Sequence, residues 1–442
     1  MPRIAAALCL CWLLLPTPQA AAQQPHVESL ATLFEDVYGP NGLVLNSDDV
    51  QLDGTNHAAH FNSAFQSDFR LVNIALTSQL TAVPLPSPAS GFTYKFDSAT
   101  GTFVRSTNSF GPILSDRAET IGRGRLAFGF SHQFFSFDHL DGVRLTAVPA
   151  VFRHDGFEAG GGRADVVSTE NSIESTVSQF TGALTYGITD RVDVSLAVPV
   201  VRTRLSLLSN ATIYRLGTGT NVRVHYFRDD LAIGGYGSSH QYFIEGSASG
   251  LGDLLVRAKA TMMREGPRAF AAGVDVRVPT GDEQNLLGAG APGVRPFAAF
   301  SASYRAFAPH ANVSYQWNGQ SVLAGDVRND IEGALPDQFL YAVGSDFSVN
   351  NRFSIVFDVL GERVLDSPRL STYTLAATGA AGSADLPDIR FANGSYWRAD
   401  GALGFKANVA AHVLVDFNLR FSLGQNGLSD RIAPLIGVEW AF

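Results

Sequence analysis

Apolar and polar residues alternate strictly in many segments after about residue 121. A strand places successive side chains on opposite faces, so this alternation predicts β-strands with one apolar face. In the segment 192–200, for example, every second residue from Val192 to Val200 is Val or Leu. Twelve segments follow the rule, at about 126–131, 180–188, 192–200, 254–262, 272–278, 298–304, 311–317, 339–349, 353–359, 397–405, 413–421 and 435–442. An even number is what a closed antiparallel transmembrane barrel requires.

Charged residues stand between the apolar positions of these segments. If the apolar face meets lipid, the charged face lines the lumen of the barrel. Seven of these residues are candidate substrate-binding positions: Arg257, Asp275, Arg277, Asp358, Arg398, Asp400 and Arg420. Two roles are open for them, because rings of charge select permeants and opposite charges on neighbouring strands also brace a wall. The alternative fold is a soluble antiparallel sheet protein with its charged face in water.

The connections between the predicted strands alternate in length. Short turns follow the even-numbered strands, for example at 189–191, 265–267, Pro309-His310 and Asn350-Asn351. Longer connections follow the odd-numbered strands, although the last of them, near 424–429, is brief. Short periplasmic turns and long extracellular loops are typical of bacterial outer-membrane barrels, and this arrangement places both chain ends on the periplasmic side.

The amino-terminal region differs from the barrel pattern. Residues 1–22 have the Arg, the short apolar run and the small residues of a secretory signal peptide, which would remove the only two cysteines, Cys9 and Cys11. In residues 23–120 we expect short helices at 27–37 and 63–80 and a hairpin between 92 and 105. This segment is open to three interpretations: a periplasmic domain, a plug or hatch inside the lumen, or two further strands that make fourteen. We favour the plug, followed by a barrel over 121–442.

Composition narrows the function without specifying it. The chain of 442 residues carries a formal net charge of −9, which argues against a nucleic-acid-binding protein of the usual basic kind. Beyond the signal there is no apolar run long enough for a helical membrane span. The run Gly288-Ala289-Gly290-Ala291-Pro292-Gly293 matches a dinucleotide fingerprint in letters only, because a strand and not a helix follows it. We therefore expect no cofactor and no metal.

The carboxyl end carries an assembly signal in this interpretation. Trp440 and Phe442 belong to the last alternating segment. An aromatic terminus resembles the last strand of bacterial outer-membrane barrels, whose assembly machinery binds a terminal Phe. The expected location is the outer membrane, and the expected partners are outer-membrane lipid, lipopolysaccharide and that machinery.

Three short runs resemble a known family: 250–254 (GLGDL), 278–282 (VPTGD) and 357–361 (FDVLG). They are similar to motifs of the outer-membrane channels assigned to the meta-pathway of phenol degradation, which are related in architecture to long-chain fatty-acid and aromatic-hydrocarbon transporters. The resemblance covers roughly residues 120–442. It implies an outer-membrane channel for passive uptake of small apolar or aromatic molecules, without covalent chemistry.

Pro199 interrupts an otherwise regular strand, because proline removes one ladder hydrogen bond. It predicts either an ordinary bulge near a rim or a gating position, where a wall defect opens the lumen sideways as in the fatty-acid transporters. Two other functions remain: an outer-membrane enzyme of the lipase or protease type, and a structural or adhesive barrel without transport. An enzyme requires a clustered Ser, His and acid at one rim, whereas a channel requires a continuous lumen.

Overall fold

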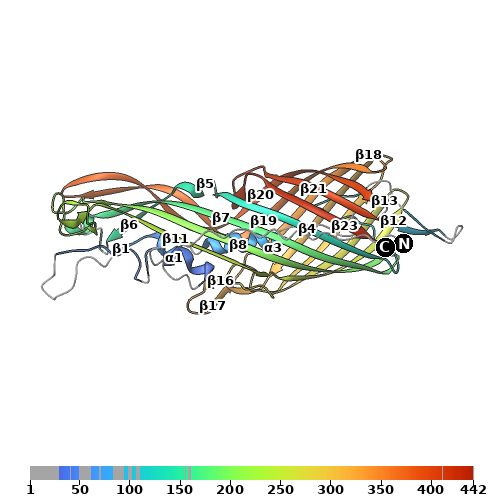
Figure 1. The fold of residues 1–442 in the computed structure, drawn as a ribbon, viewed down its shortest axis with the longest axis horizontal. Coiled ribbons are helices and arrows are strands. Elements are labelled where there is room, and N and C mark those ends of the chain that lie inside the picture. The colour runs from blue at the N-terminus through green and yellow to red at the C-terminus, as the bar shows by residue number, and fades with distance from the viewer. Residues whose placement is uncertain are drawn as a thin grey trace, which may run out of the picture.

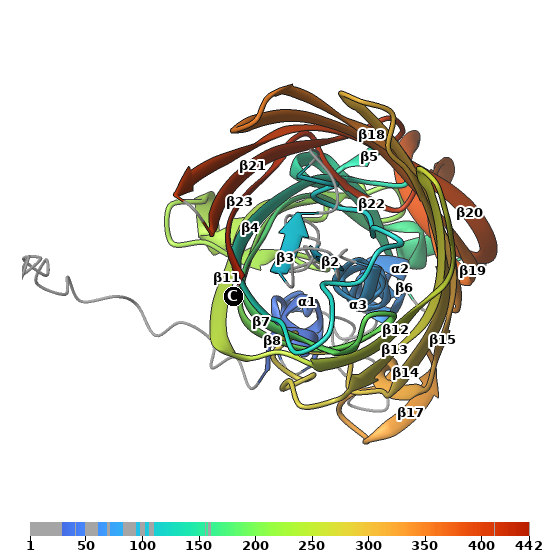
Figure 2. The same ribbon diagram turned by 90° about the vertical axis from the view of Figure 1, so that its right-hand side faces the viewer.

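A computed structural model describes residues 29–39, 41–48, 61–68, 71–82, 94–97, 102–105, 110–154, 156–157, 161–410 and 412–441. Its main feature is a closed antiparallel barrel, seen end-on in Figure 2. Twelve strands form the wall: β4 (Leu126–Leu140), β7 (Val166–Thr189), β8 (Val192–Tyr214), β12 (Leu254–Glu265), β13 (Arg268–Val278), β14 (Gly293–Ala302), β15 (Phe307–Asn318), β18 (Gln338–Asn350), β19 (Phe353–Gly379), β20 (Gly382–Ala410), β21 (Val413–Ser422) and β23 (Ala433–Ala441). The predicted twelve-strand barrel is confirmed.

The barrel closes between its first and last strands. β23 pairs with β4 in antiparallel register, with Val438 opposite Phe130 and Trp440 opposite Phe128. On the other side of β4, Phe130 lies opposite Gly182 of β7. Closure matters because an open sheet edge inside a bilayer would leave backbone groups without hydrogen bonds.

Four wall strands are far longer than a membrane requires. β7, β8, β19 and β20 have 24, 23, 27 and 29 residues, whereas about 9–11 residues span the hydrocarbon core. Their outer halves, with β6 (Val148–His154) and β11 (Ser239–Leu251), form an elongated region on the left of Figure 1, here called the extension. The expected long loop after the ninth strand is wrong, because β19 and β20 continue to a turn at 380–381.

The outward face changes character along these long strands. In β7 the side chains of Phe180, Leu184 and Ile188 are exposed at 59 %, 37 % and 47 %, and they form part of the apolar belt. Nearer the tip, the exposed outward positions are Glu170 and Glu174. The first part of the strand therefore meets water and the second part meets lipid.

The turns at the other end orient the molecule. Hairpin turns after Thr189, Glu265 and Asn350 lie at the end opposite the extension, as does the carboxyl end of the chain. The predicted turn at Pro309-His310 is wrong in position, because both residues lie inside β15 and the turn precedes Phe307. Short turns mark the periplasmic side, so the extension points to the cell exterior.

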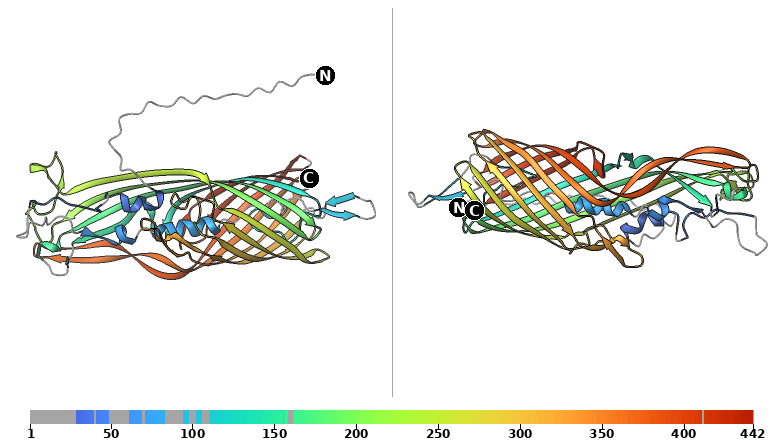
Figure 3. Two further views of the ribbon diagram at one scale, coloured as in Figure 1. Left: turned by 90° about the horizontal axis from the view of Figure 1, so that it is seen from below. Right: turned by 180° about the vertical axis from the view of Figure 1, so that it is seen from behind.

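Short helices fill the extension (Figure 3). They are η1 (Leu30–Thr32), α1 (Leu33–Asp36), α2 (Ala64–Asp68) and α3 (Val72–Ala82), which match the two predicted helical regions. Phe34 and Phe65 from the helices join Phe152 of β6 and Leu205 of β8 in one buried apolar cluster. In the described residues β11 pairs only with β8, and β19 beyond Ser367 pairs only with β20. α1 lies against β11, and α3 lies against β16 and β19.

The remaining elements are small. They are β1 (Phe61–Asn62), β2 (Tyr94–Asp97), β3 (Thr102–Arg105), β5 (Val143–Arg144), η3 (Leu145–Ala147), η5 (Gly161–Ala164), β9 (Phe227–Arg228), η6 (Ile233–Gly235), β10 (Tyr236–Gly237), β16 (Gln320–Asp326), β17 (Ile331–Ala334) and β22 (Leu428–Asp430). β2 and β3 form the predicted hairpin as a sheet of their own. They add no strand to the wall, so the fourteen-strand alternative is not what forms. The predicted signal peptide lies outside the described residues.

Candidate functional site

A segment without regular secondary structure lies inside the membrane-spanning barrel. Residues 110–122, here called the strap, precede β4, and almost all of them are buried. Side chains from the wall hold the strap backbone. Asn312 of β15 binds both backbone groups of Asp116, which donates its N–H over 2.7 Å and accepts from Nδ2 over 2.8 Å.

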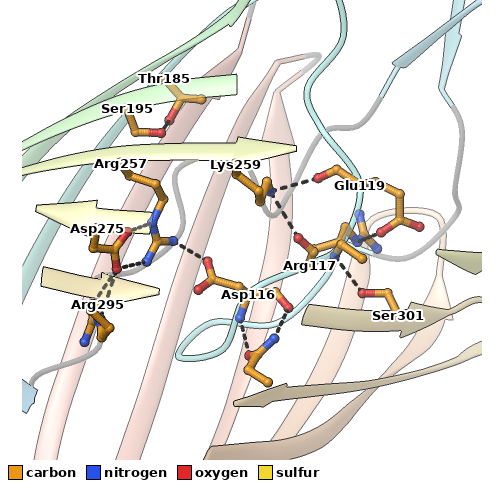
Figure 4. A network of polar contacts seen from close by, with 12 residues as sticks. Asp116, Arg117, Glu119, Thr185, Ser195, Arg257, Lys259, Asp275, Arg295 and Ser301 are labelled. Carbon is orange, nitrogen blue, oxygen red and sulfur yellow. Dashed lines mark hydrogen bonds and ion pairs between the residues drawn. The ribbon is translucent and has the colours of Figure 1, made fainter. Parts of the chain in front are cut away.

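The same kind of contact recurs along the strap (Figure 4). The Ala118 N–H donates to Ser301 Oγ over 2.9 Å, and Thr261 Oγ1 donates to the Ala118 carbonyl over 2.6 Å. Lys259 Nζ donates to the carbonyl oxygens of Arg117 and Glu119 over 3.1 and 2.9 Å. A strap without a ladder of its own needs such partners, because an unpaired buried backbone group costs about as much as a lost hydrogen bond.

The lumen beside the strap contains a cavity of about 100 Å³, here called the lumen cavity. On one wall Arg257 of β12 forms a bidentate pair with Asp275 of β13, with N–O distances of 2.6 and 2.8 Å. Its Nη1 donates to the Asp116 carboxylate of the strap over 2.5 Å. Arg295 of β14 binds the same Asp275 through Nε and Nη2, over 3.0 and 2.8 Å. One wall carboxylate thus serves two guanidinium groups (Figure 4).

A second charged cluster lines the opposite side. Arg398 of β20 donates to Asp400 over 2.6 Å and lies 3.3 Å from Glu362. It also contacts Gln79 of α3, which connects the helices to the lumen. Arg420 of β21 lies 3.6 Å from Asp400. These pairs fit the bracing role considered for the lumen charges.

The remaining lining of the lumen cavity has an apolar part, made of Leu114, Phe297, Leu340, Tyr341, Ala342 and Leu360, and a polar part, made of Ser115, Asn312 and Ser314. The guanidinium carbon of Arg257 lies 4.8 Å from the centre of the Phe297 ring. A cation over an aromatic face at this distance is a favourable contact. The lumen cavity therefore offers apolar surface and fixed positive charge side by side.

The structure brings together five of the seven predicted binding residues. Arg257, Asp275, Arg398, Asp400 and Arg420 all line the lumen cavity. Their lumen-facing position is a finding, and their binding of a permeant stays a prediction.

The other two predicted residues lie elsewhere. Arg277 donates to Asn318 over 2.8 Å and lies 3.6 Å from Asp253, beside a second, smaller cavity. Asp358 is buried and accepts from Ser115 of the strap over 3.0 Å, and it contacts His310 over 2.6 Å.

The contact of Ser115, His310 and Asp358 bears on the enzyme hypothesis. In a hydrolytic triad the serine bonds to the histidine, which removes its proton. Here the carboxylate stands in the middle, and both Ser115 and His310 bond to Asp358 Oδ1. This order leaves Ser115 without an activating base, so the set does not have the geometry of a nucleophile site.

Some lining residues were not predicted. Arg295 and Phe297 share the inward parity of β14, and extending the alternation backward from Phe300 would have found them. Asp116 had no such signal, because the strap has no periodic pattern.

Pro199 lies where the wall changes partners. The β7–β8 register is continuous through Thr181 opposite Pro199, so no bulge forms against β7. On its other side, β8 pairs with β12 up to Ala197 and with β11 from Val200 onward. The carbonyl of Pro199 accepts from Gly252 between these two strands. The side of Pro199 that lacks an N–H thus faces the β11–β12 junction, where no regular ladder requires a hydrogen-bond donor.

The carboxyl-terminal residues fit a lipid-facing last strand. The Trp440 side chain is 49 % exposed on the outer surface of β23. Phe442 lies outside the described residues, so the predicted assembly signal stays a prediction.

Comparison with known proteins supports the resemblance noted from the sequence. A family model described as putative MetA-pathway of phenol degradation matches residues 155–357. No curated protein matches the chain in sequence. Among solved structures, the COG4313 outer membrane channel from Pseudomonas putida F1 is 13 % identical, with 74 % of this chain and 99 % of that chain covered and a TM-score of 0.45.

Two further similar structures are a Pseudomonas aeruginosa FadL homologue and the P. putida toluene transporter TodX. Their identities are 10 % and 10 %, their TM-scores 0.31 and 0.32. They cover 82 % and 72 % of this chain, and this chain covers 96 % and 89 % of theirs. Since these values are low, the fold assignment rests on the strand register of the chain itself.

The exterior of the barrel gives the location. No described helix has the length and apolar character to cross a membrane. The wall crosses with strands instead, and Phe130, Leu196, Phe357, Leu403 and Ile436 belong to its exposed apolar belt. Closed antiparallel barrels with such a belt are the architecture of the bacterial outer membrane. The chain is an outer-membrane β-barrel protein.

Proposed function

We propose that this protein is an outer-membrane channel for the passive uptake of small apolar or aromatic molecules. The observation that carries the proposal is the lumen cavity, which lies inside a closed barrel and combines apolar lining with charged groups. Ligand sites are concave, mostly apolar and equipped with a few placed polar groups. Structures with a similar fold include a toluene transporter and a monoaromatic hydrocarbon channel, which fits this proposal.

In this proposal the strap and the amino-terminal helices are the plug. The strap contacts the inner faces of β12, β14, β15 and β19 through Lys259, Ser301, Asn312 and Asp358. A permeant that crosses the barrel must move the strap or pass beside it. Because these bonds are side-chain contacts and not a β-ladder, they can break without unfolding the wall.

Pro199 is the proposed gating position in the wall. The loop 279–292 covers the β11–β12 junction from inside, with Thr203 Oγ1 donating to the Leu286 carbonyl over 3.0 Å. Asp253 accepts from the N–H groups of Gly281 and Ala289 and holds the loop there. Movement of this loop would expose the junction to lipid.

The enzyme alternative is weaker on the present geometry, since the Ser115–Asp358–His310 order does not activate a nucleophile. We therefore propose no catalytic activity. Binding of lipopolysaccharide and of the assembly machinery also belongs to the proposal, and the Trp440 side chain on the outer face supports it.

One experiment tests the channel and its plug together. The predicted mature chain has no cysteine, so the pair Ala118→Cys and Ser301→Cys can tie the strap to β14, where the two residues already touch. Flux of benzyl alcohol into proteoliposomes is measured with the disulfide reduced and oxidised. We expect flux in the reduced form and its loss on oxidation, while the single variant Ala118→Cys does not respond to oxidation.

The outcomes separate the parts of the proposal. Absence of flux in wild type and in the reduced pair contradicts the channel itself. Equal flux in both redox states leaves the channel and contradicts the plug. In the same assay Pro199→Val should lower the uptake of apolar solutes, and unchanged uptake would contradict the gate at the junction.

A further inference from the structure

The wall of the lumen cavity has a charge imbalance that the strap corrects. Arg257 and Arg295 share the single carboxylate of Asp275, so the three wall groups together carry one positive charge. The side chains of Arg257 and Arg295 are 12 % and 11 % exposed, and that of Asp275 is 1 % exposed. A positive charge held out of water requires a counter-charge. The nearest one is the Asp116 carboxylate, which belongs to the strap.

The other charges around the lumen cavity do not compensate this triad. Across the cavity, the lining groups Arg398 and Arg420 face Glu362 and Asp400, two positive and two negative groups. Asp430, outside the lining, adds its carboxylate next to Arg420 and Arg398 and not next to the triad. Lys259, two residues from Arg257 on the same face of β12, donates to the Arg117 and Glu119 carbonyl oxygens and lies opposite Asp193 of β8. The carboxylate of Asp116 therefore occupies a site that the wall builds for an anion.

We propose that this site takes the carboxylate of a small aromatic acid, which exchanges with Asp116 on Arg257. The inference rests on the proposed channel and specifies its substrate class. Guanidinium groups recognise carboxylates through paired N–H donors, and Asp116 shows that this geometry accommodates one. The Phe297 ring, 4.8 Å from the Arg257 guanidinium, and Leu340 and Leu360 supply the apolar surface for the ring of the ligand.

Asp116 acts in this proposal as a tethered competitor. Its backbone is fixed by Asn312, so its carboxylate stays near Arg257 at a high effective concentration. Exchange needs only a side-chain rotation of Asp116, since the backbone bonds of the strap do not depend on its carboxylate. A neutral aromatic molecule has no group to exchange and gains only the apolar contacts.

Equilibrium dialysis of the purified full-length protein tests the exchange, with benzoate, its neutral analogue benzamide, and acetate as a carboxylate without a ring. We expect benzoate to bind more tightly than benzamide or acetate by about tenfold, which is the effect of one charge-assisted pair. Asp116→Asn should tighten benzoate binding several-fold and leave benzamide unchanged, because it removes the competing charge. Arg295→Gln should abolish the preference for benzoate.

Asp190→Asn is the matched control, since the Asp190 side chain accepts from the N–H of Arg123, one residue beyond the strap, and does not line the cavity. Heat-modifiable mobility on gels verifies that each variant is folded. Equal binding of benzoate and benzamide in wild type, or benzoate binding that Asp116→Asn does not change, overturns the inference. A parallel flux assay with benzamide keeps the two proposals apart: its passage supports the channel whether or not the anion site exists.

Discussion

The two halves of the long strands obey opposite rules. In β7, the membrane half turns Phe180, Leu184 and Ile188 outward and buries Gln179 and Thr181. In the extension half the outward residues are polar, and Val167, Ile173 and Val177 point inward and are almost completely buried. The parity of the strand does not change between the halves. The difference shows that the solvent on each side, and not the strand geometry, decides which face carries the apolar residues.

The contents of the two halves differ in the same way. The extension encloses helices against an apolar wall and has a hydrophobic core like that of a soluble protein. The membrane half encloses the strap, which polar side chains hold. We therefore expect the extension to be stabilised mainly by apolar burial, and the membrane half by the lipid contact of its exterior and by the hydrogen bonds of its lumen.

The largest loss of stability should come from substituting an inward-facing residue of the extension. Phe152 in the extension is completely buried and packs edge-on against Tyr38 at 5.0 Å. Phe152→Ala should lower the free energy of unfolding of the extension by about 3–5 kcal/mol. Hydrogen-exchange mass spectrometry should find the lost protection in residues 148–177.

Ser195→Ala is its counterpart in the membrane half, where Ser195 bonds to Thr185 over 2.8 Å. The loss of this bond should cost about 1 kcal/mol. Equal losses at the two positions would contradict the difference between the two interiors.

At outward positions a substitution should cost more stability in the membrane half than in the extension. Leu184→Arg places a charge in the lipid-facing belt and should cost about 2–4 kcal/mol in urea titrations of the protein folded into vesicles. Ser172→Arg, twelve residues away on the same outward face, lies in the extension and should change stability by less than about 0.5 kcal/mol. A large cost at position 172 would show that the belt extends further than the exposed apolar residues indicate.

A smaller effect, of pH on stability, should appear in the extension. Burial acts to raise the pKa of Asp165, but hydrogen bonds from His225, Thr218 and Gly217 outweigh it and hold the pKa below its usual value. A carboxylate with a lowered pKa stabilises the fold above its unfolded pKa of about 3.9 and loses this contribution as the pH falls through the folded pKa. The extension should therefore unfold at a lower temperature once the pH falls below about 4.

Asp165→Asn should reduce this pH dependence. Asp385→Asn, at an exposed position of β20, serves as control and should retain it. If both variants keep the wild-type pH profile, the bonds to Asp165 do not stabilise the extension.

The sequence predicts the membrane half well, because period-two alternation is a local signal. All twelve strands and the lumen-facing charges follow from it. The sequence predicts the long strands too short for a physical reason. The apolar positions of β7 change from inward Val177 to outward Phe180, which breaks the alternation although the strand continues. A pattern search that assumes one apolar face per strand ends at that point.

The site was predicted only in part for a related reason. The wall residues that line the lumen cavity belong to strands in which apolar and polar residues alternate, so their position in that alternation reveals them. Asp116 and the strap are placed by contacts with Asn312, Ser301 and Lys259, which come from strands far away in the sequence. Such long-range pairing leaves no local pattern.

The change of outward polarity along β7 and β8 also fixes the position of the barrel along the membrane normal. On β8 the outward face changes from Val200 to Arg202, so sliding the barrel along the membrane normal would drive Arg202 into hydrocarbon or lift Val200 into water. Either displacement costs free energy, so the two strands determine how deeply the barrel is inserted. The barrel is therefore expected to be inserted at one depth in the outer membrane, and the lumen cavity keeps a constant distance from the two membrane surfaces.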